Sequence, residues 1–342
     1  MPDLETLPIL DLSLLDAGPE SAAKFRDQLR AATHDLGFFY LIGTGVSPEL
    51  EAEMFAAAEA FFDLPEEQKL EIENINSPHF RGYTRLGGER TLGQVDWREQ
   101  IDISPEEEAV PASQLANHPD FVRLRGPNQW PSALPSLRPV VHKWEERLTE
   151  VSRKLLRSWA VSLGEDETYF DDNFGDPFTL LKIIKYPGTD RTQQGVGSHK
   201  DAGVLTLLKL QDASTGLQVL RKDGEWIDAP PVPGAFVVNI GEMLEYATQG
   251  YLRATTHRVI APKTSSSRIS IPFFFNPALD ARLPLIRLPP ELAAEANGVS
   301  TEAHNPIHAL YGENALKSRL RAHPDVAQIH HSDILATWTV KA

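Results

Sequence analysis

The sequence predicts an α+β fold in which an antiparallel double sheet of the jelly-roll type forms the core and helices pack outside it. The first observation is a series of short β-branched and apolar runs that starts at Leu180; the runs read LLKIIKY, VLTLLKL, GLQVL, AFVVNI and RISIPFFF. Turn residues separate them, and Asp223-Gly224 is typical of a hairpin. Many short strands at regular spacing over roughly a hundred residues indicate two packed antiparallel sheets.

The second observation is helical periodicity before these strands. Apolar residues repeat at helical spacing over residues 19–36 and again after Ser47-Pro48, so the first sixty or so residues are expected to be helical. A long helix is expected over residues 137–163, because its apolar residues share one face and Gly164 follows as a C-terminal cap.

The length of 342 residues, 41% of them hydrophobic, fits one large domain or two of ordinary size, and we favour one. Residues 1–130 are expected to form an N-terminal helical region with substrate-side loops, which packs on the core. In it, residues 70–130 are polar and carry only short strand-like pieces such as 97–103. Residues 131–342 are expected to hold the jelly-roll core and a C-terminal tail.

The composition excludes several classes of site and partner. Cysteine is absent, which rules out disulfides, thiolate zinc sites, iron-sulfur clusters and cysteine nucleophiles. The net charge of -15 disfavours nucleic acid or an anionic membrane as the main partner. Neither a membrane helix nor a signal peptide is evident, so we expect a cytoplasmic protein that acts on a small molecule. The oligomeric state is not predicted.

His199 and Asp201 are the first candidate ligands of a metal ion. On a strand, side chains two residues apart point to the same face, so this imidazole and this carboxylate can share one ion. His257, at a turn-rich approach to another apolar strand, is the best third ligand. Two histidines and one carboxylate form the facial triad of non-haem iron(II) oxygenases, which leaves positions open for other ligands. The remaining histidines are expected to be structural or solvent-facing.

Arg268 and Ser270 form a second constellation. Both side chains share a face if the segment is a strand, and a guanidinium beside a hydroxyl is suited to grip a carboxylate. A small diacid that chelates the metal could place its far end here. The alternative is an arginine at a strand end that lies in water.

Longer segments around these residues resemble the iron(II)/2-oxoglutarate-dependent oxygenases of the isopenicillin N synthase-like branch. The resemblance covers residues from about 7 to 276, and a segment near residue 311 is similar to the family's usual end. It is carried by GVGSHKDAGVLTLLKLQDASTGLQV, GEWIDAPPVPGAFVVNIGEMLEYATQG, ATTHRVIAP, RISIPFF, LPILDLS, LGFFYLIGTGV, FFDLPEEQK and FRGYTRLGGE. His-x-Asp, a distal His and Arg-x-Ser in this order are a specific signal.

The resemblance implies the fold and the roles of residues. The fold is a double-stranded β-helix. His199, Asp201 and His257 would bind Fe(2+), and the distal carboxylate of 2-oxoglutarate would be bound by Arg268, Ser270 and Tyr186. The sequence departs from the family pattern at position 184, where isoleucine replaces a frequent asparagine.

The function that the resemblance implies is that of a dioxygenase using Fe(2+), 2-oxoglutarate and O2, with ascorbate as a reductant. It would hydroxylate, desaturate or cyclise a small molecule through an iron(IV)-oxo intermediate and release succinate and CO2. Three alternatives stay open: an iron oxidase of the same fold that does not consume 2-oxoglutarate, a zinc hydrolase, and a non-catalytic jelly-roll binding module.

The wall of the substrate pocket is predicted only by position in the sequence. The FRGYTRLGG segment and the end of the Arg-x-Ser strand both carry large side chains close to the expected site. The alternative for aromatic residues beside apolar strands is plain core. The candidates are Phe80, Arg81, Tyr83, Phe273 and Phe275.

Overall fold

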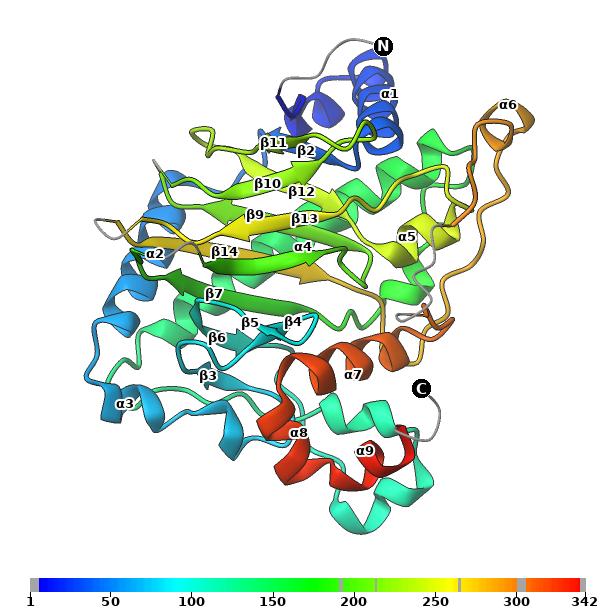
Figure 1. The fold of residues 1–342 in the computed structure, drawn as a ribbon. Coiled ribbons are helices and arrows are strands. Elements are labelled where there is room, and N and C mark those ends of the chain that lie inside the picture. The colour runs from blue at the N-terminus through cyan, green and yellow to red at the C-terminus, as the bar shows by residue number, and fades with distance from the viewer. Residues whose placement is uncertain (1–5, 191–192, 213, 264–265, 300–305, 339–342) are drawn as a thin grey trace.

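Two β-sheets lie face to face in the centre of the molecule, and helices cover the outer face of the larger sheet (Figure 1). The computed structural model describes residues 6–190, 193–212, 214–263, 266–299 and 306–338. The site residues predicted from the sequence all lie within these ranges, so the fold can be followed to each of them.

The larger sheet has eight strands among the described residues. Its neighbours pair antiparallel, except that the first two strands of the chain are parallel. In spatial order the strands are β1 (Ile9–Asp11), β2 (Phe38–Ile42), β12 (Phe236–Ile240), β9 (Leu205–Leu210), β14 (Arg268–Phe275), β7 (Leu180–Tyr186), β6 (Glu99–Ile103) and β3 (Gly82–Thr84).

The smaller sheet has four antiparallel strands in the described part of the chain. In order they are β11 (Trp226–Asp228), β10 (Leu217–Leu220), β13 (His257–Ile260) and β8 (Gln194–His199). The hairpin expected at Asp223-Gly224 is confirmed, because β10 pairs with β11 around it and Gly224 adopts φ 90°. A short ribbon of β4 (Arg90–Thr91) and β5 (Gln94–Val95) lies beside β8.

A hydrophobic cluster between the sheets holds them together. Val196 and Val259 come from the smaller sheet, and Ile184 and Val237 come from the larger one. All four are nearly inaccessible to solvent. Burying such side chains stabilises the fold by about 1.5–3 kcal/mol each, which keeps the gap between the sheets narrow except where polar residues line it.

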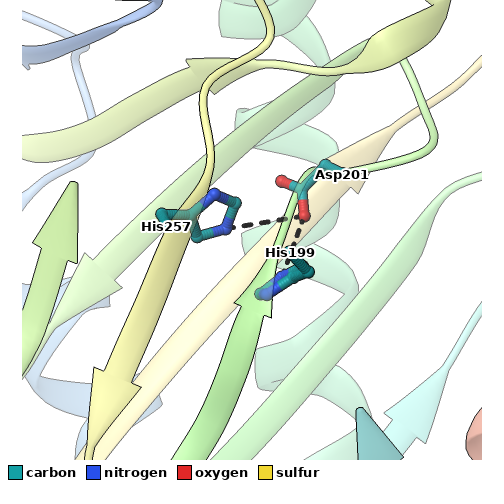
Figure 2. Close-up of side chains that lie close together, drawn as sticks. All are labelled: His199, Asp201 and His257. Atoms are coloured by element: carbon teal, nitrogen blue, oxygen red, sulfur yellow. Dashed lines mark ion pairs between the residues drawn. The ribbon is translucent and has the colours of Figure 1, made fainter. Parts of the chain in front are cut away.

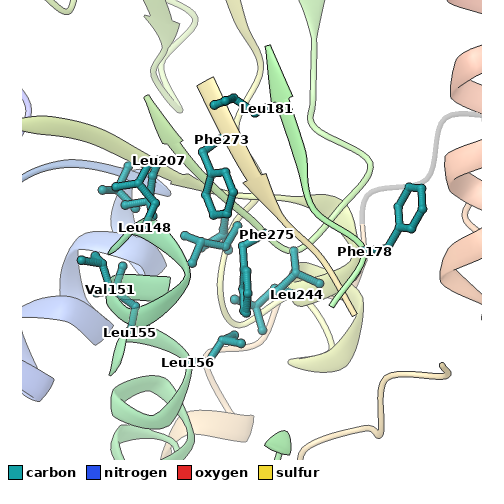
Figure 3. Packing of buried hydrophobic residues seen from close by; sticks show 14 of the residues in the cluster. Leu148, Val151, Leu155, Leu156, Phe178, Leu181, Leu207, Leu244, Phe273 and Phe275 are labelled. Atoms are coloured by element: carbon teal, nitrogen blue, oxygen red, sulfur yellow. The ribbon is translucent and has the colours of Figure 1, made fainter. Parts of the chain in front are cut away.

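A second and larger cluster lies between the large sheet and the helices. Figure 3 shows Leu148, Val151 and Leu155 of the long helix α4 (Leu137–Ser162) against Phe273 and Phe275 of β14. The other helices are α1 (Pro19–Asp35), α2 (Pro48–Phe62), α3 (Glu66–Leu70), α5 (Glu242–Ala247), α6 (Pro290–Ala293), α7 (Tyr311–Ala322), α8 (Pro324–His330) and α9 (Ser332–Trp338). Short 3-10 helices cover Leu12–Asp16, Asn74–Asn76, Ala112–Asn117, Asp120–Leu124 and Asp171–Phe174.

The helix ends follow the signals in the sequence. Pro48 is the first residue of α2, and the Ser47 hydroxyl accepts a hydrogen bond from the Leu50 N–H at 3.2 Å, as an N-cap does. After α1, Gly37 adopts φ 74°, and a Cβ there would lie 2.0 Å from the Arg253 carbonyl oxygen. Only glycine therefore fits this turn.

The N-terminal region is less purely helical than the sequence predicts. β1 and β2 lie within the first sixty residues, and β3 lies within the polar segment of residues 70–130, where β6 confirms the strand-like piece expected at residues 97–103. The run FFYLI of β2 is almost wholly buried between neighbouring strands, so a short apolar run between two helices becomes a sheet strand. The first 130 residues thus contribute strands to the same sheet as the later ones.

In the described ranges, no helix combines the length and the apolar character that crossing a membrane requires.

Candidate active site

Three polar side chains converge at the end of the smaller sheet. His199 is the last residue of β8, His257 is the first residue of β13, and the two are cross-strand partners. Asp201 lies two residues beyond the end of β8. The expectation that His199 and Asp201 share a strand is therefore wrong, but the turn that carries Asp201 brings its carboxylate to both histidines (Figure 2).

The distances within this cluster suit a single ion. Nε2 of His199 lies 3.5 Å from Oδ1 of Asp201, and Nε2 of His257 lies 3.7 Å from the same oxygen. One ligand atom from each residue lies within 4.8 Å of the other two. Two imidazoles and one carboxylate on one side of an ion form a facial triad, which leaves the opposite side open.

Backbone carbonyl groups fix the orientation of both imidazole rings. Nδ1 of His199 lies 2.7 Å from the Gly197 carbonyl oxygen, and Nδ1 of His257 lies 3.1 Å from that of Thr255. A carbonyl oxygen can only accept, so each Nδ1 carries the proton and donates it. Each Nε2 is then an unprotonated lone pair that can bind a metal.

The two oxygens of Asp201 have different partners. Oδ2 accepts hydrogen bonds from the Thr206 hydroxyl at 2.6 Å and from the Asn239 side-chain amide at 2.8 Å. Thr206 belongs to β9 and Asn239 to β12, both in the larger sheet. Oδ1 is thereby left to face the histidines, so the larger sheet orients a carboxylate whose metal partners come from the smaller sheet.

The turn that carries Asp201 is itself held by backbone contacts. The Asp201 carbonyl accepts from the Glu242 N–H at 2.8 Å, and the Val204 N–H donates to Oδ1 of Asn276 at 3.0 Å. A Cβ on Gly203 would lie 2.0 Å from that same Asn276 oxygen. A glycine at this position lets the turn approach β14 closely enough for Asp201 to reach the cluster.

Burial and mutual proximity shift the pKa values of the three groups. Burial alone would raise the pKa of the Asp201 carboxyl, but His257, His199 and the Thr206 hydroxyl hold it well below its usual range. Burial, together with the neighbouring His199, lowers the pKa of His257 to about 4. Burial opposes protonation of His199, but its hydrogen bond with Asp201 and the charge of that carboxylate raise its pKa above the usual value. A metal ion binds a neutral imidazole and an ionised carboxylate, so it would replace the proton that Asp201 favours on His199.

A cavity of about 310 Å³, the larger cavity, opens from this cluster toward Arg268. Arg268, Ser270 and Tyr186 line it together with all three residues of the cluster. Arg268 is 3% exposed; its Nη1 donates to the Thr215 carbonyl oxygen at 2.9 Å, and its guanidinium lies 4.6 Å from the centre of the Tyr186 ring. Its Nε is buried without a hydrogen-bond partner. An orphaned donor on a buried cation is suited to an anionic ligand.

A second cavity of about 230 Å³, the smaller cavity, meets the first at the cluster. His199, Asp201 and Thr206 line both cavities. The smaller cavity reaches the C-terminal helix α7, from which Tyr311 and Arg319 contribute. Both residues lie in the tail segment near residue 311 that resembles the family's usual end, but the sequence predicted no role for either of them.

A buried network of charges separates the smaller cavity from the edge of the large sheet. Nζ of Lys182 lies 3.1 Å from an oxygen of Glu89 and 3.1 Å from an oxygen of Asp102. Arg98 pairs with Glu89 at 3.2 Å, and Arg319 pairs with Asp102. Burial opposes ionisation of Glu89, yet Arg98 and Lys182 bring its pKa down to about 2. Glu89 and Lys182 line both cavities.

The structure does not bring the predicted wall residues to these cavities. The Tyr83 hydroxyl donates to Glu99 at 2.7 Å inside the core. Phe80 stacks on His331 at 5.0 Å, and the buried Arg81 donates to the Leu124 carbonyl oxygen at 2.9 Å.

Phe273 and Phe275 point to the helical layer because they alternate with the residues that face the other sheet (Figure 3). Phe274, between them, lines both cavities instead. Strand periodicity thus identifies the wall residue of β14 once the face of Arg268 and Ser270 is known.

Two sequence families match the chain. The family described as the 2OG-Fe(II) oxygenase superfamily matches residues 177–277, which contain the metal cluster, Arg268 and Ser270. The family described as non-haem dioxygenase in morphine synthesis N-terminal matches residues 7–133.

Relatives cover nearly the whole chain. A 2-oxoglutarate-dependent dioxygenase, frbJ, from Dothideomycetidae sp. (strain 11243) is 36% identical over 343 residues, which are 95% of this chain and 91% of that protein. Homoarginine-6-hydroxylase 2-ODD-C23.2 of Arabidopsis thaliana is 36% identical and covers 81% of this chain and 79% of its own. The crystal structure of a full-length Neurospora crassa protein in complex with alpha-KG has a TM-score of 0.73 at 25% identity, with 93% of this chain and 97% of that chain covered. The chain therefore belongs to the 2OG-Fe(II) oxygenase superfamily and is a non-haem iron(II)/2-oxoglutarate-dependent dioxygenase.

Proposed function

We propose that His199, Asp201 and His257 hold the iron(II) ion of this dioxygenase. The donor set supports the assignment, because two unprotonated imidazole nitrogens and a carboxylate oxygen lie within 4.8 Å of one another. Bound iron(II), together with 2-oxoglutarate and O2, supplies the oxidising power of the reaction. The protein holds both Nδ1 atoms in hydrogen bonds to backbone carbonyl groups, so that each Nε2 faces the site, and it turns Oδ1 of Asp201 toward them.

The second part of the proposal is that Arg268, Ser270 and Tyr186 bind the distal carboxylate of 2-oxoglutarate. One observation carries the proposal: a single cavity of about 310 Å³ has both the metal cluster and Arg268 on its wall. A diacid bound there would bring its far carboxylate to the buried guanidinium and neutralise it. Ile184 pairs with Ser270 across the strands and contributes only apolar surface where related enzymes often have asparagine.

We read the two sheets as a jelly roll, the double-stranded β-helix. The last eight strands, β7 to β14, form the order β12-β9-β14-β7 in one sheet and β11-β10-β13-β8 in the other. Successive strands cross between the sheets except from β10 to β11, as two interlocked Greek keys require. Residues 1–130 would then be a covering region that extends one sheet, so that the whole chain is one structural unit.

Among the reactions open to such a site, we propose hydroxylation of a C–H bond of a small molecule. The name of the Arabidopsis relative, a homoarginine-6-hydroxylase, supports hydroxylation over desaturation or cyclisation. The cavities support a small molecule over nucleic acid or membrane, since their volumes are only about 230 and 310 Å³. Membership of the family argues against a zinc hydrolase and against a non-catalytic binding module. An oxidase that does not use 2-oxoglutarate would leave Arg268 without a carboxylate to bind.

Anaerobic titration with iron(II) and 2-oxoglutarate tests this proposal. We expect a weak visible charge-transfer band when both are present, and slow succinate release once air and ascorbate are admitted. The matched control is the Asp201→Ala variant, which should give no band although its circular dichroism equals that of the parent. A parent protein without the band would overturn the assignment of the cluster as the iron site.

A further inference from the structure

We propose that the substrate carries a carboxylate and that Arg319 of α7 binds this group in the smaller cavity. The inference rests on the proposed function, because it takes the metal cluster as the place of the reaction. Arg319 lines the smaller cavity together with His199 and Asp201. The inference concerns the chemical class of the substrate, which neither the metal cluster nor the larger cavity toward Arg268 defines.

The contacts of Arg319 leave one edge of its guanidinium open. Its contacts with Asp102 and His323 both use Nη1. Within the described residues, its Nε and Nη2 have no hydrogen-bond partner, and the side chain is 11% exposed. Nε and Nη2 are the parallel donors that bind the two oxygens of a carboxylate. Asp102 therefore anchors the residue by one nitrogen and leaves a carboxylate-binding edge at the cavity.

Other polar groups at this cavity also lack acceptors. The Oδ1 atom of Asn276 accepts from the Val204 N–H at 3.0 Å, so its NH2 group is oriented away from that bond, and it has no partner among the described residues. The Tyr311 hydroxyl likewise has none there, and burial raises the pKa of Tyr311, which keeps it a donor. Both oxygens of Glu89 are already paired with Lys182. The cavity thus offers donors, and a matching ligand must offer acceptors.

The charge of the wall also favours an anion. The cationic residues are Lys182, Lys200 and Arg319, and the acidic ones are Glu89 and Asp201. Lys182 is paired with Glu89 and Asp102, and Lys200 is paired with Glu245 at 3.3 Å. Arg319 is the cation of this wall whose Nε and Nη2 remain for an anionic ligand among the described residues.

The rest of the wall is apolar and limits the size of the ligand. Leu124, Phe178 and Leu180 line the same cavity of about 230 Å³. A cavity of this size with charged groups along one side fits a small acid whose remaining part is largely apolar. The carboxylate at Arg319 would then direct the other end of the molecule toward the metal cluster.

A paired panel of compounds tests this inference with the full-length protein. Small carboxylic acids, including amino acids, are each compared with the matching primary amide, and succinate release is measured with iron(II), 2-oxoglutarate and ascorbate. Binding is read separately, without oxygen, from the change that each compound causes in the visible iron–2-oxoglutarate band. We expect acids to stimulate succinate release and to shift the band, and their amides to do neither at the same concentration.

Two variants connect the preference to Arg319. Arg319→Lys keeps the positive charge and can still bond Asp102, but it lacks the paired donors; we expect KM for the best acid to rise about 10- to 100-fold. Arg319→Gln removes the charge, so the ratio of kcat/KM for acid over amide should fall toward one. Arg147→Gln is the control, because Arg147 pairs with Glu150 on the exposed face of α4.

The outcomes separate this inference from the proposed function. If the parent protein forms the iron–2-oxoglutarate band but amides or neutral compounds stimulate it as well as acids, the carboxylate assignment fails while the metal site stands. The same holds if Arg319→Gln keeps the preference of the parent. If no band forms at all, the failure lies with the proposed function. A change in thermal stability without a change in the acid-to-amide ratio would show that Arg319 only anchors α7.

Discussion

The Thr206 hydroxyl donates to Oδ2 of Asp201 at 2.6 Å, and this bond decides which carboxylate oxygen faces the histidines. It joins β9 of the larger sheet to the turn that follows β8 of the smaller sheet. The geometry of the metal cluster therefore depends on how the two sheets are packed.

Thr206→Val should weaken iron binding without removing a ligand. Valine has nearly the same shape, so the packing is kept while Asp201 loses one of the two donors that orient it. Loss of such an outer partner typically lowers metal affinity by about 10- to 100-fold. Anaerobic iron(II) titration gives the dissociation constant. Thr248→Val is the control, because the Thr248 hydroxyl bonds to α5 backbone; equal losses in both variants would contradict the orienting role.

Asp201→Ala should abolish binding of iron(II) while the protein stays folded. The carboxylate supplies the only charge of the triad, and its removal also leaves Thr206 and Asn239 without their shared acceptor. Atomic absorption after desalting measures the bound iron, and far-ultraviolet circular dichroism reports the fold. Retention of one iron per chain by this variant would move the metal site elsewhere.

Arg268→Gln should raise the dissociation constant for 2-oxoglutarate about 10- to 100-fold and leave that for iron(II) nearly unchanged. The reason is that Arg268 lines the larger cavity but is not part of the metal cluster. Isothermal titration without oxygen separates the two constants. Arg258→Gln serves as control, since Arg258 lies over the Trp226 ring at 4.0 Å and bonds to Gln218. An equal effect on iron would refute a role confined to the cosubstrate.

Glu145 should make stability depend on pH. Burial raises the pKa of its carboxyl from 4.5 to about 7, with Arg81 opposing, and Oε1 is buried without a partner. Between these values the folded protein holds a proton that the unfolded chain releases, so this group costs stability as the pH rises from about 4.5 to about 7. Glu145→Gln should remove that loss. The free energy of unfolding of the variant should exceed that of the parent by about 3 kcal/mol at pH 8 and match it near pH 4.5.

Guanidinium unfolding at several pH values measures this difference. Comparing the parent with the variant cancels the contributions of all other titrating groups. A difference that stays constant from pH 4.5 to pH 8 would mean that Glu145 does not titrate in this range.

Local sequence patterns were sufficient for the core strands and for the cluster of His199, Asp201 and His257. Strand periodicity and turn residues are local properties, and they predicted the runs that become β7, β9, β10, β12 and β14. The turn that carries Asp201 could not be predicted in this way, because it is held by contacts with Glu242 and Asn276, which are distant in the chain. Proximity in sequence still brought its carboxylate to His199.

The strand-like piece expected at residues 97–103 contains β6, but the charged network around this strand lay beyond such reasoning. β6 reads EQIDI and is buried throughout, although three of its residues are polar, because Lys69 and Lys182 pair with its acids. Arg319 reaches Asp102 across 217 positions of the chain. The sequence does not show which partner a charged residue will have after folding. The ion pairs that make burial of this polar strand possible could therefore not be predicted from it.

Because α7 supplies part of the wall of the smaller cavity, this cavity is completed by a helix that follows β14 in the chain. A nascent chain that has reached β14 already contains every proposed metal and cosubstrate residue, yet its chamber would still stand open to water on one side. A C-terminal truncation that removes α7 should therefore yield an enzyme that still binds iron and 2-oxoglutarate. It should consume 2-oxoglutarate without binding its substrate.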